Sequence, residues 1–197
     1  MKYLVFDASP ISKPKDYKAP FTDTFSWPRM IHLSWIMLND DLKPIHDFDC
    51  VVNPEGFAIT DQIAKYARLD KEEIEKKGED LEDILKQFTK SAEEADYIIA
   101  HNMNANECIV AAEYMRKNMH PPIFTKERIC LMQEATWFCK IPSKGGGYKW
   151  PTLNELYSIL FHQRYTPANN ARADVIAAAR SFIMLKKKGE LEDLFEE

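Results

Sequence analysis

The stretch KYLVFD, residues 2–7, decides the fold of this chain. It is too short and too uniformly apolar for an amphipathic helix, so it predicts a central strand buried on both faces, with Asp7 at its carboxyl end. The runs MIHLSWIML (30–38) and IHDFDCVV (45–52) follow, joined by the turn NDDLKP (39–44). Both are rich in β-branched and aromatic residues, and the second alternates polar and apolar positions. Together these segments predict a three-stranded antiparallel meander.

Helical periodicity follows the meander. Apolar residues recur at helical spacing up to about residue 95, and a short apolar run, YIIAHN (97–102), precedes another helical stripe over 108–119. A strand that leads directly into a helix is typical of a crossover, which favours parallel pairing with the first strand. Further helices are predicted at 152–161, which opens with a Thr-x-x-Glu capping pattern, and at 171–185. The expected fold class is therefore α/β, a mixed sheet flanked by helices.

The composition is that of a globular chain. With 197 residues, 45% of them hydrophobic, it is long enough for one domain with its own core, predicted to span 1–197. The net charge of -5 argues against binding nucleic acid through bulk positive charge, so any such site must be local. The four cysteines form no Cys-x-x-Cys pair, and the sequence contains no recognisable secretory signal or membrane span. These features predict a cytoplasmic protein without membrane attachment.

Polar residues gather where the predicted strands end and the helices begin. Asp7 follows the first strand, the His101-Asn102 step follows the parallel strand, and Asn169 and Asp174 open the last helix. In mixed and parallel sheets these positions meet at one edge, where binding and catalytic groups collect. They are therefore the candidate functional site.

The first of these positions lies in a motif that resembles a known family. The DEDDh 3′-5′ exonucleases include ribonuclease T and the proofreading epsilon subunit of bacterial DNA polymerase III, and they carry a hydrophobic strand followed by Asp-x-Glu-Thr-Thr-Gly. Here YLVFDASPIS (3–12) keeps Asp7 but has Ser9 where the family has its glutamate. The family also has a His-Gly-Ile turn, which helps contact the terminal nucleotide. At the corresponding place this sequence has Ala-Arg-Leu, residues 67–69.

The other two family motifs are also recognisable and also altered. HNMNAN (101–106) resembles His-Asn-x-x-Phe-Asp, with Asn106 in place of the acid. NNARAD (169–174) resembles His-x-Ala-x-x-Asp, keeping Asp174 but with Asn169 at the histidine. The resemblance covers nearly the whole chain and implies a ribonuclease H-like fold. A deliberate Asp-to-Asn substitution would account for Asn106 alone, but not for the other changes.

The resemblance implies what these changes remove. In the family, carboxylates hold two divalent cations that clamp the scissile phosphate, while the histidine takes a proton from the attacking water. Hydroxyl and amide oxygens are weaker partners for Mg²⁺ or Mn²⁺ than carboxylates. We therefore expect Asp7 and Asp174 to hold at most one weakly bound Mg²⁺ or Mn²⁺ ion, and catalysis to be lost or weak.

The candidate nucleic-acid contacts lie outside these motifs. The loop from Cys139 to Trp150 contains Lys144, Tyr148 and Lys149 with a run of glycines, a composition suited to phosphate contact and base stacking as well as to an ordinary solvated loop. Arg172, inside the third motif, adds a further cation. The partner that the family resemblance implies is the 3′ end of single-stranded DNA or RNA.

Two nearby residues carry side chains of the kinds that are missing. Glu107 follows Asn106, but an Asn104-x-x-Glu107 helix cap is the preferred interpretation. His162 precedes Asn169 and is expected to be a structural or surface imidazole rather than a relocated base.

Two other functional interpretations stay open beside the impaired, nucleic-acid-binding scaffold. One is a working 3′-5′ exonuclease with a reduced, one-metal site. The other is a protein-interaction module, in which the old cleft or an edge strand serves as a docking surface, including for a homodimer.

Overall fold

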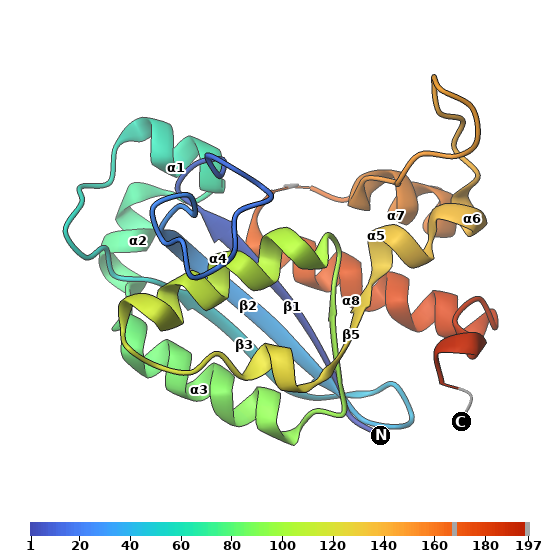
Figure 1. Cartoon of the computed structure of the whole chain (residues 1–197), viewed down its shortest axis with the longest axis horizontal. Coiled ribbons are helices and arrows are strands. Elements are labelled where there is room, and N and C mark those ends of the chain that lie inside the picture. The colour runs from blue at the N-terminus through green and yellow to red at the C-terminus, as the bar shows by residue number, and fades with distance from the viewer. Residues whose placement is uncertain (167–168, 196–197) are drawn as a thin grey trace.

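A five-stranded mixed sheet forms the centre of the molecule in the computed structural model, which describes residues 1–166 and 169–195 (Figure 1). The strands stand in the order β3-β2-β1-β4-β5. The strands are β1 Tyr3–Pro10, β2 Met30–Leu38, β3 Pro44–Val51, β4 Tyr97–Ala100 and β5 Glu127–Cys130. The helices are α1 Asp61–Ala67, α2 Lys71–Lys77, α3 Leu81–Glu94, α4 Met103–Arg116, α5 Leu131–Glu134, α6 Thr136–Cys139, α7 Leu153–Phe161 and α8 Ala171–Lys187, with short 3-10 turns η1 Pro122–Thr125 and η2 Glu192–Leu194.

The predicted meander and the predicted parallel strand are both present. β1 pairs antiparallel with β2, where Asp7 lies opposite Ser34, and β2 pairs antiparallel with β3. β1 pairs on its other side with β4, in parallel, and β4 pairs in parallel with β5. The fold class predicted from the sequence is therefore confirmed. β1 continues past the predicted end to Pro10, which carries Ser9 into the sheet.

Helices cover both faces of the sheet (Figure 1). Even-numbered residues of β1, such as Phe6, pack with Trp35 and Phe88 under α3 and α4. Odd-numbered residues, such as Tyr3, pack with Phe182 against α7 and α8. Because side chains alternate along a strand, Asp7 and Ser9 continue the odd-numbered face toward the start of α8.

The proline-containing excursion between β1 and β2 is held against α4. Glu113 of α4 is fully buried and accepts hydrogen bonds from the Arg29 Nε at 2.9 Å and from the Met30 backbone at 2.8 Å. Arg116 donates to the carbonyls of Thr24 and Trp27. These contacts fix the segment that overhangs the carboxyl end of β1.

Helix starts follow the capping chemistry of the sequence, with one exception. Thr152 and Glu155 form the capping box predicted at the start of α7. The predicted Asn104-x-x-Glu107 cap is wrong: α4 begins after Asn102, which is left-handed and makes no side-chain cap, so both residues lie inside the helix. No helix in the described ranges is both long and apolar enough to cross a lipid bilayer.

Candidate functional site

A cleft of about 910 Å³ opens at the carboxyl ends of β1 and β4. Its floor is the end of β1, and its sides are the first turn of α4, the chain entering α8, helix α1 and the excursion after β1. The structure brings the motif residues of distant segments together in this one cleft; they are Asp7, Ser9, Asn106, Asn169 and Asp174.

Asp7 and Asp174 form a partly buried acidic pair. Burial, followed by the charge of Asp174, raises the pKa of Asp7 well above its usual value, against a lowering contribution from Asn106. Burial raises the pKa of Asp174 to about 6, and hydrogen bonds from Tyr165 and from the Asn169 backbone oppose the shift. Near neutral pH this pair therefore carries less negative charge than two solvated carboxylates.

The side-chain amide of Asn106 forms hydrogen bonds with three backbone groups. Its Oδ1 accepts from the Ala8 N–H at 2.8 Å, and its Nδ2 donates to the carbonyls of His101 at 2.9 Å and Asn102 at 3.2 Å. The amide thus joins β1 to the β4–α4 turn. A carboxylate could accept from Ala8 but could not donate to either carbonyl. Asn106 is a structural brace rather than a ready metal ligand.

The start of α8 holds Asp174 from two sides. The Tyr165 hydroxyl donates to Asp174 Oδ1 at 2.7 Å, and the backbone N–H of Asn169, a residue with φ 66°, donates to the same atom at 3.1 Å. Asn169 has an amide where the motif has an imidazole, so it cannot take a proton from water at neutral pH. The Oδ1 atom of Asp174 therefore already accepts two hydrogen bonds from the protein.

The remaining oxygen donors are few for a pair of divalent cations. At the motif positions they are the carboxylate of Asp7, the second oxygen of Asp174, the hydroxyl of buried Ser9 and the amide oxygen of Asn169. No group of three or more His, Cys, Asp or Glu side chains suited to a metal ion occurs in the part of the chain that the structure describes. Mg²⁺ needs near-octahedral oxygen ligation, and two such ions need more carboxylate ligands than the two acids of this donor set provide. A two-metal centre does not fit these residues.

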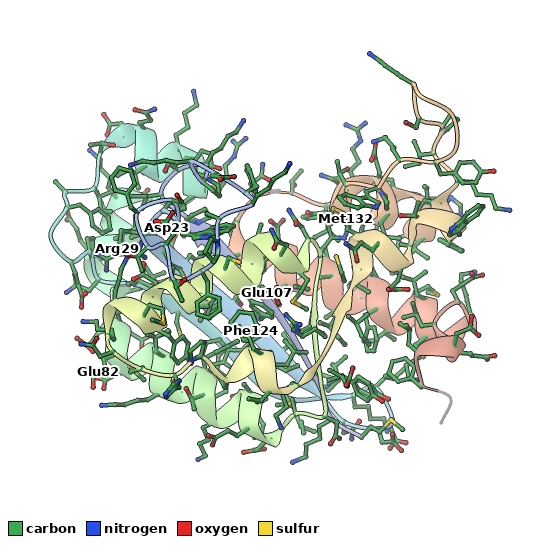
Figure 2. All side chains as sticks on the ribbon, viewed as in Figure 1. Asp23, Arg29, Glu82, Glu107, Phe124 and Met132 are labelled. Carbon is green, nitrogen blue, oxygen red and sulfur yellow. The ribbon has the colours of Figure 1, made fainter. Side chains whose placement is uncertain are left out.

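Glu107 does not replace the missing acid. It is buried, points to the β5 side of α4 and pairs with Arg128, with 2.8 Å between Glu107 Oε2 and Arg128 Nη1 (Figure 2). It lines a neighbouring hollow with Phe124 instead of the cleft. His162, the other candidate, is the left-handed C-cap of α7 and does not line the cleft.

The four predicted nucleic-acid contacts lie outside the residues that line the cleft. Lys144 and Tyr148 belong to a hairpin over 141–149, which projects from the body of the molecule as the orange loop of Figure 1. Lys149 returns from that hairpin to pair with Glu155 at 2.7 Å. Arg172 pairs with Asp47 of the edge strand β3. Two of the four predicted contacts are thus already engaged in ion pairs.

Other residues of the cleft were not predicted from the sequence. Lys13, Lys65 and Arg68 line it, as does Tyr165. Lys13 lies far along the chain from the others, so only the fold reveals the group. Arg68 stood in the altered His-Gly-Ile turn, and that signal could have drawn attention to it.

No protein-family model matches this sequence. No curated protein matches it either. Solved structures of exonuclease I do resemble it: a product-bound form at TM-score 0.72 and 14% identity covers 98% of this chain and 46% of that chain. The E. coli enzyme in complex with a dT13 oligonucleotide gives TM-score 0.73 and 14% identity, covering 98% of this chain and 42% of that one.

A zinc-bound form of an E. coli exonuclease I–ssDNA complex gives TM-score 0.74 at 14% identity, again over 98% of this chain and 42% of that chain. This chain thus spans less than half the length of the exonuclease I chains that it matches. The likeness establishes the fold: a ribonuclease H-like exonuclease fold, with a mixed sheet flanked by helices.

Proposed function

We propose that this chain is a DEDDh exonuclease-like protein that binds nucleic acid but is catalytically impaired. The observation that carries the proposal is the state of the motif positions in the cleft. Two acids remain, Asp7 and Asp174, while the Asn106 amide is bonded to three backbone groups and Asn169 stands where a base is needed. The cleft keeps its place at the strand ends, but its chemistry is reduced.

The expected loss of turnover follows from the missing groups. Removal of a general base typically costs about 10²–10⁴ in rate. Loss of the charge stabilisation from a bound metal costs several kcal/mol more. Together these effects leave little hydrolysis in this cleft, whether or not a single Mg²⁺ or Mn²⁺ ion binds weakly at Asp7 and Asp174.

The proposed ligand is the 3′ end of single-stranded DNA or RNA. Two features support it: an open cleft at the carboxyl ends of the strands, and the fold shared with exonuclease I, whose structures include oligonucleotide complexes. The projecting hairpin, with Lys144, Tyr148 and Lys149, could extend the contact beyond the cleft, and Arg172 could join it by exchanging Asp47 for a phosphate.

A working one-metal 3′-5′ exonuclease is the second candidate. It is favoured by the closeness of Asp7 and Asp174, with Ser9 in the same cleft, because Mg²⁺ sites often use one or two carboxylates completed by substrate phosphate oxygens.

A Mn²⁺ titration with end-labelled single-stranded DNA and RNA tests the proposal. We expect binding without release of terminal mononucleotides. Turnover that Asp7→Ala abolishes would establish the one-metal enzyme and overturn the impaired scaffold. Absence of both binding and turnover would point to a protein-interaction module, and sedimentation of the purified chain would then test for a homodimer.

A further inference from the structure

Three cations, Lys13, Lys65 and Arg68, line the cleft that holds the acidic pair. Within residues 1–166 and 169–195, the structure gives none of their side chains an ion pair. Lys149 and Arg172, by contrast, are bound to Glu155 and Asp47. Unlike Lys149 and Arg172, the three cleft cations can therefore take an anionic ligand without first breaking an ion pair within the described residues.

The backbone holds these cations in place. Arg68 is the left-handed C-cap of α1, and its carbonyl accepts a hydrogen bond of 3.0 Å from the Asn170 Nδ2. Lys65 lies in the last turn of the same helix. Lys13 lies in the excursion, between hydrogen bonds of 2.9 Å from the Ile11 N–H to the Arg29 carbonyl and from the Lys15 N–H to the Ser26 carbonyl. Both segments are fixed before any ligand arrives, which lowers the cost of ordering on binding.

The charge balance in the cleft differs from that of the whole chain. The chain carries a net charge of -5, but among the residues that line the cleft the three cations are opposed by two acids, Asp7 and Asp174. The cleft is thus locally positive on an acidic molecule. A two-metal exonuclease instead needs a negatively charged site, because its carboxylates must bind divalent cations.

Aromatic rings line the same cleft as the cations. Tyr17, Tyr66 and Trp150 line the same cleft, and Trp150 is 58% exposed. Exposed rings next to cations suit a strand whose bases stack and whose phosphates are paired. They suit a free inorganic anion less well, because it has no base to stack.

We propose that the cleft binds the phosphates of a single strand through Lys13, Lys65 and Arg68, without a divalent cation. The inference rests on the proposed function and adds the means of binding: protein cations take the phosphate-neutralising role that bound metal would have. Two observations support this conclusion. A two-metal centre does not fit Asp7, Asp174, Ser9 and Asn106, and the same cleft is lined by cations that have no ion pair within the described part of the chain.

Fluorescence anisotropy with a labelled oligothymidylate, measured in EDTA and again with Mn²⁺, tests the inference. We expect the same affinity in both conditions. Each of Lys13→Ala, Lys65→Ala and Arg68→Ala should weaken binding several-fold and reduce the slope of log affinity against log salt by about 0.7. Lys65→Arg, which keeps the charge, should retain most of the affinity. The matched control is Lys90→Ala, an exposed lysine of α3 outside the cleft, which should bind as the wild type does.

The outcomes separate this inference from the proposed function. Binding that requires Mn²⁺, or binding in EDTA that the three alanine variants leave unchanged, overturns the inference but leaves a nucleic-acid-binding protein. Absence of binding under every condition overturns both. An unlabelled oligoribonucleotide competitor then shows whether the same cations accept RNA, and inorganic phosphate as competitor shows how much of the affinity comes from the phosphate alone.

Discussion

At the scale of single residues, the hydrogen bonds of Asn106 explain why an aspartate at this position is not expected to create a metal site. Its amide spans Ala8, His101 and Asn102. A carboxylate at this position would leave the buried His101 carbonyl without its side-chain donor, whereas the Asn102 carbonyl would keep the backbone N–H of residue 106. The brace and the metal ligand are alternative uses of the same position.

Asn106→Asp should therefore lower stability without restoring turnover. Leaving a buried acceptor unpaired costs about 1–3 kcal/mol, so the free energy of unfolding should fall by about that amount. Urea unfolding measures the loss, and the matched control Asn53→Asp, at an exposed position, should change little. A variant as stable as the wild type that releases mononucleotides with Mn²⁺ would show that the brace is dispensable.

His101 should make stability depend on pH. Burial lowers its pKa from 6.5 to about 4, although the hydrogen bond to the Pro151 carbonyl opposes the shift. Between these values the unfolded chain binds the proton and the folded chain does not, so this residue's contribution is lost as pH falls from 6.5 toward 4.

The slope due to His101 should approach about 1.4 kcal/mol per pH unit within that window. The measurement is the difference in free energy of unfolding between wild type and His101→Gln across the window. Taking the difference cancels the groups that both proteins share, including the acidic pair. A difference that does not change with pH would contradict the assigned cause.

At the scale of elements, segments with a clear apolar pattern were predictable, whether long or short. The strand at 30–38 was predicted with the bounds that the structure gives β2, and the short run at 97–102 contains β4. The single helix expected up to about residue 95 is instead divided into α2 and α3, because α2 ends at Gly78. β5 was missed because ERIC is a short strand with two charged residues in a four-residue run, so its position beside β4 comes from tertiary pairing. The acids and altered motif positions could be found by order and spacing. Lys13 and Lys65 could not, because no local pattern connects a loop to a distant helix.

Glu113 ties the excursion, the start of β2 and α4 into one unit. Glu113→Ala should cost about 1–3 kcal/mol of stability, because it leaves the buried Met30 N–H without its acceptor, while Arg29 keeps its pair with Glu55. Thermal unfolding and limited proteolysis of the excursion measure the effect. Glu72→Ala, which removes only an exposed pair with Lys76, is the control and should change stability by about 0.5 kcal/mol or less. Equal effects of the two changes would refute the anchoring role.

At the scale of the whole molecule, the two largest hydrophobic clusters share the same central strands. Leu4 and Phe6 of β1 belong to one cluster, and Tyr3 and Val5 belong to the other. If either helical layer unfolded, one face of β1 would be exposed to water. The stability of each layer therefore depends on the other.

We therefore expect one cooperative unfolding transition for residues 1–197. Tryptophan fluorescence and far-ultraviolet circular dichroism should give the same midpoint in urea, because a single transition moves both signals together. Trp27 and Trp35 are buried, so their emission reports on the α3–α4 side of the core. Separate midpoints would mean that the chain unfolds as more than one domain.

The side chain of Asn170 has a mechanical consequence. It caps α8 by accepting from the Arg172 and Ala173 N–H groups, and it also donates to the Arg68 carbonyl. One amide thus couples the wall that carries the acid to the wall that carries the arginine. A ligand that displaces the end of α1 or the start of α8 also strains this hydrogen bond. We therefore expect these two walls of the cleft to move together rather than independently.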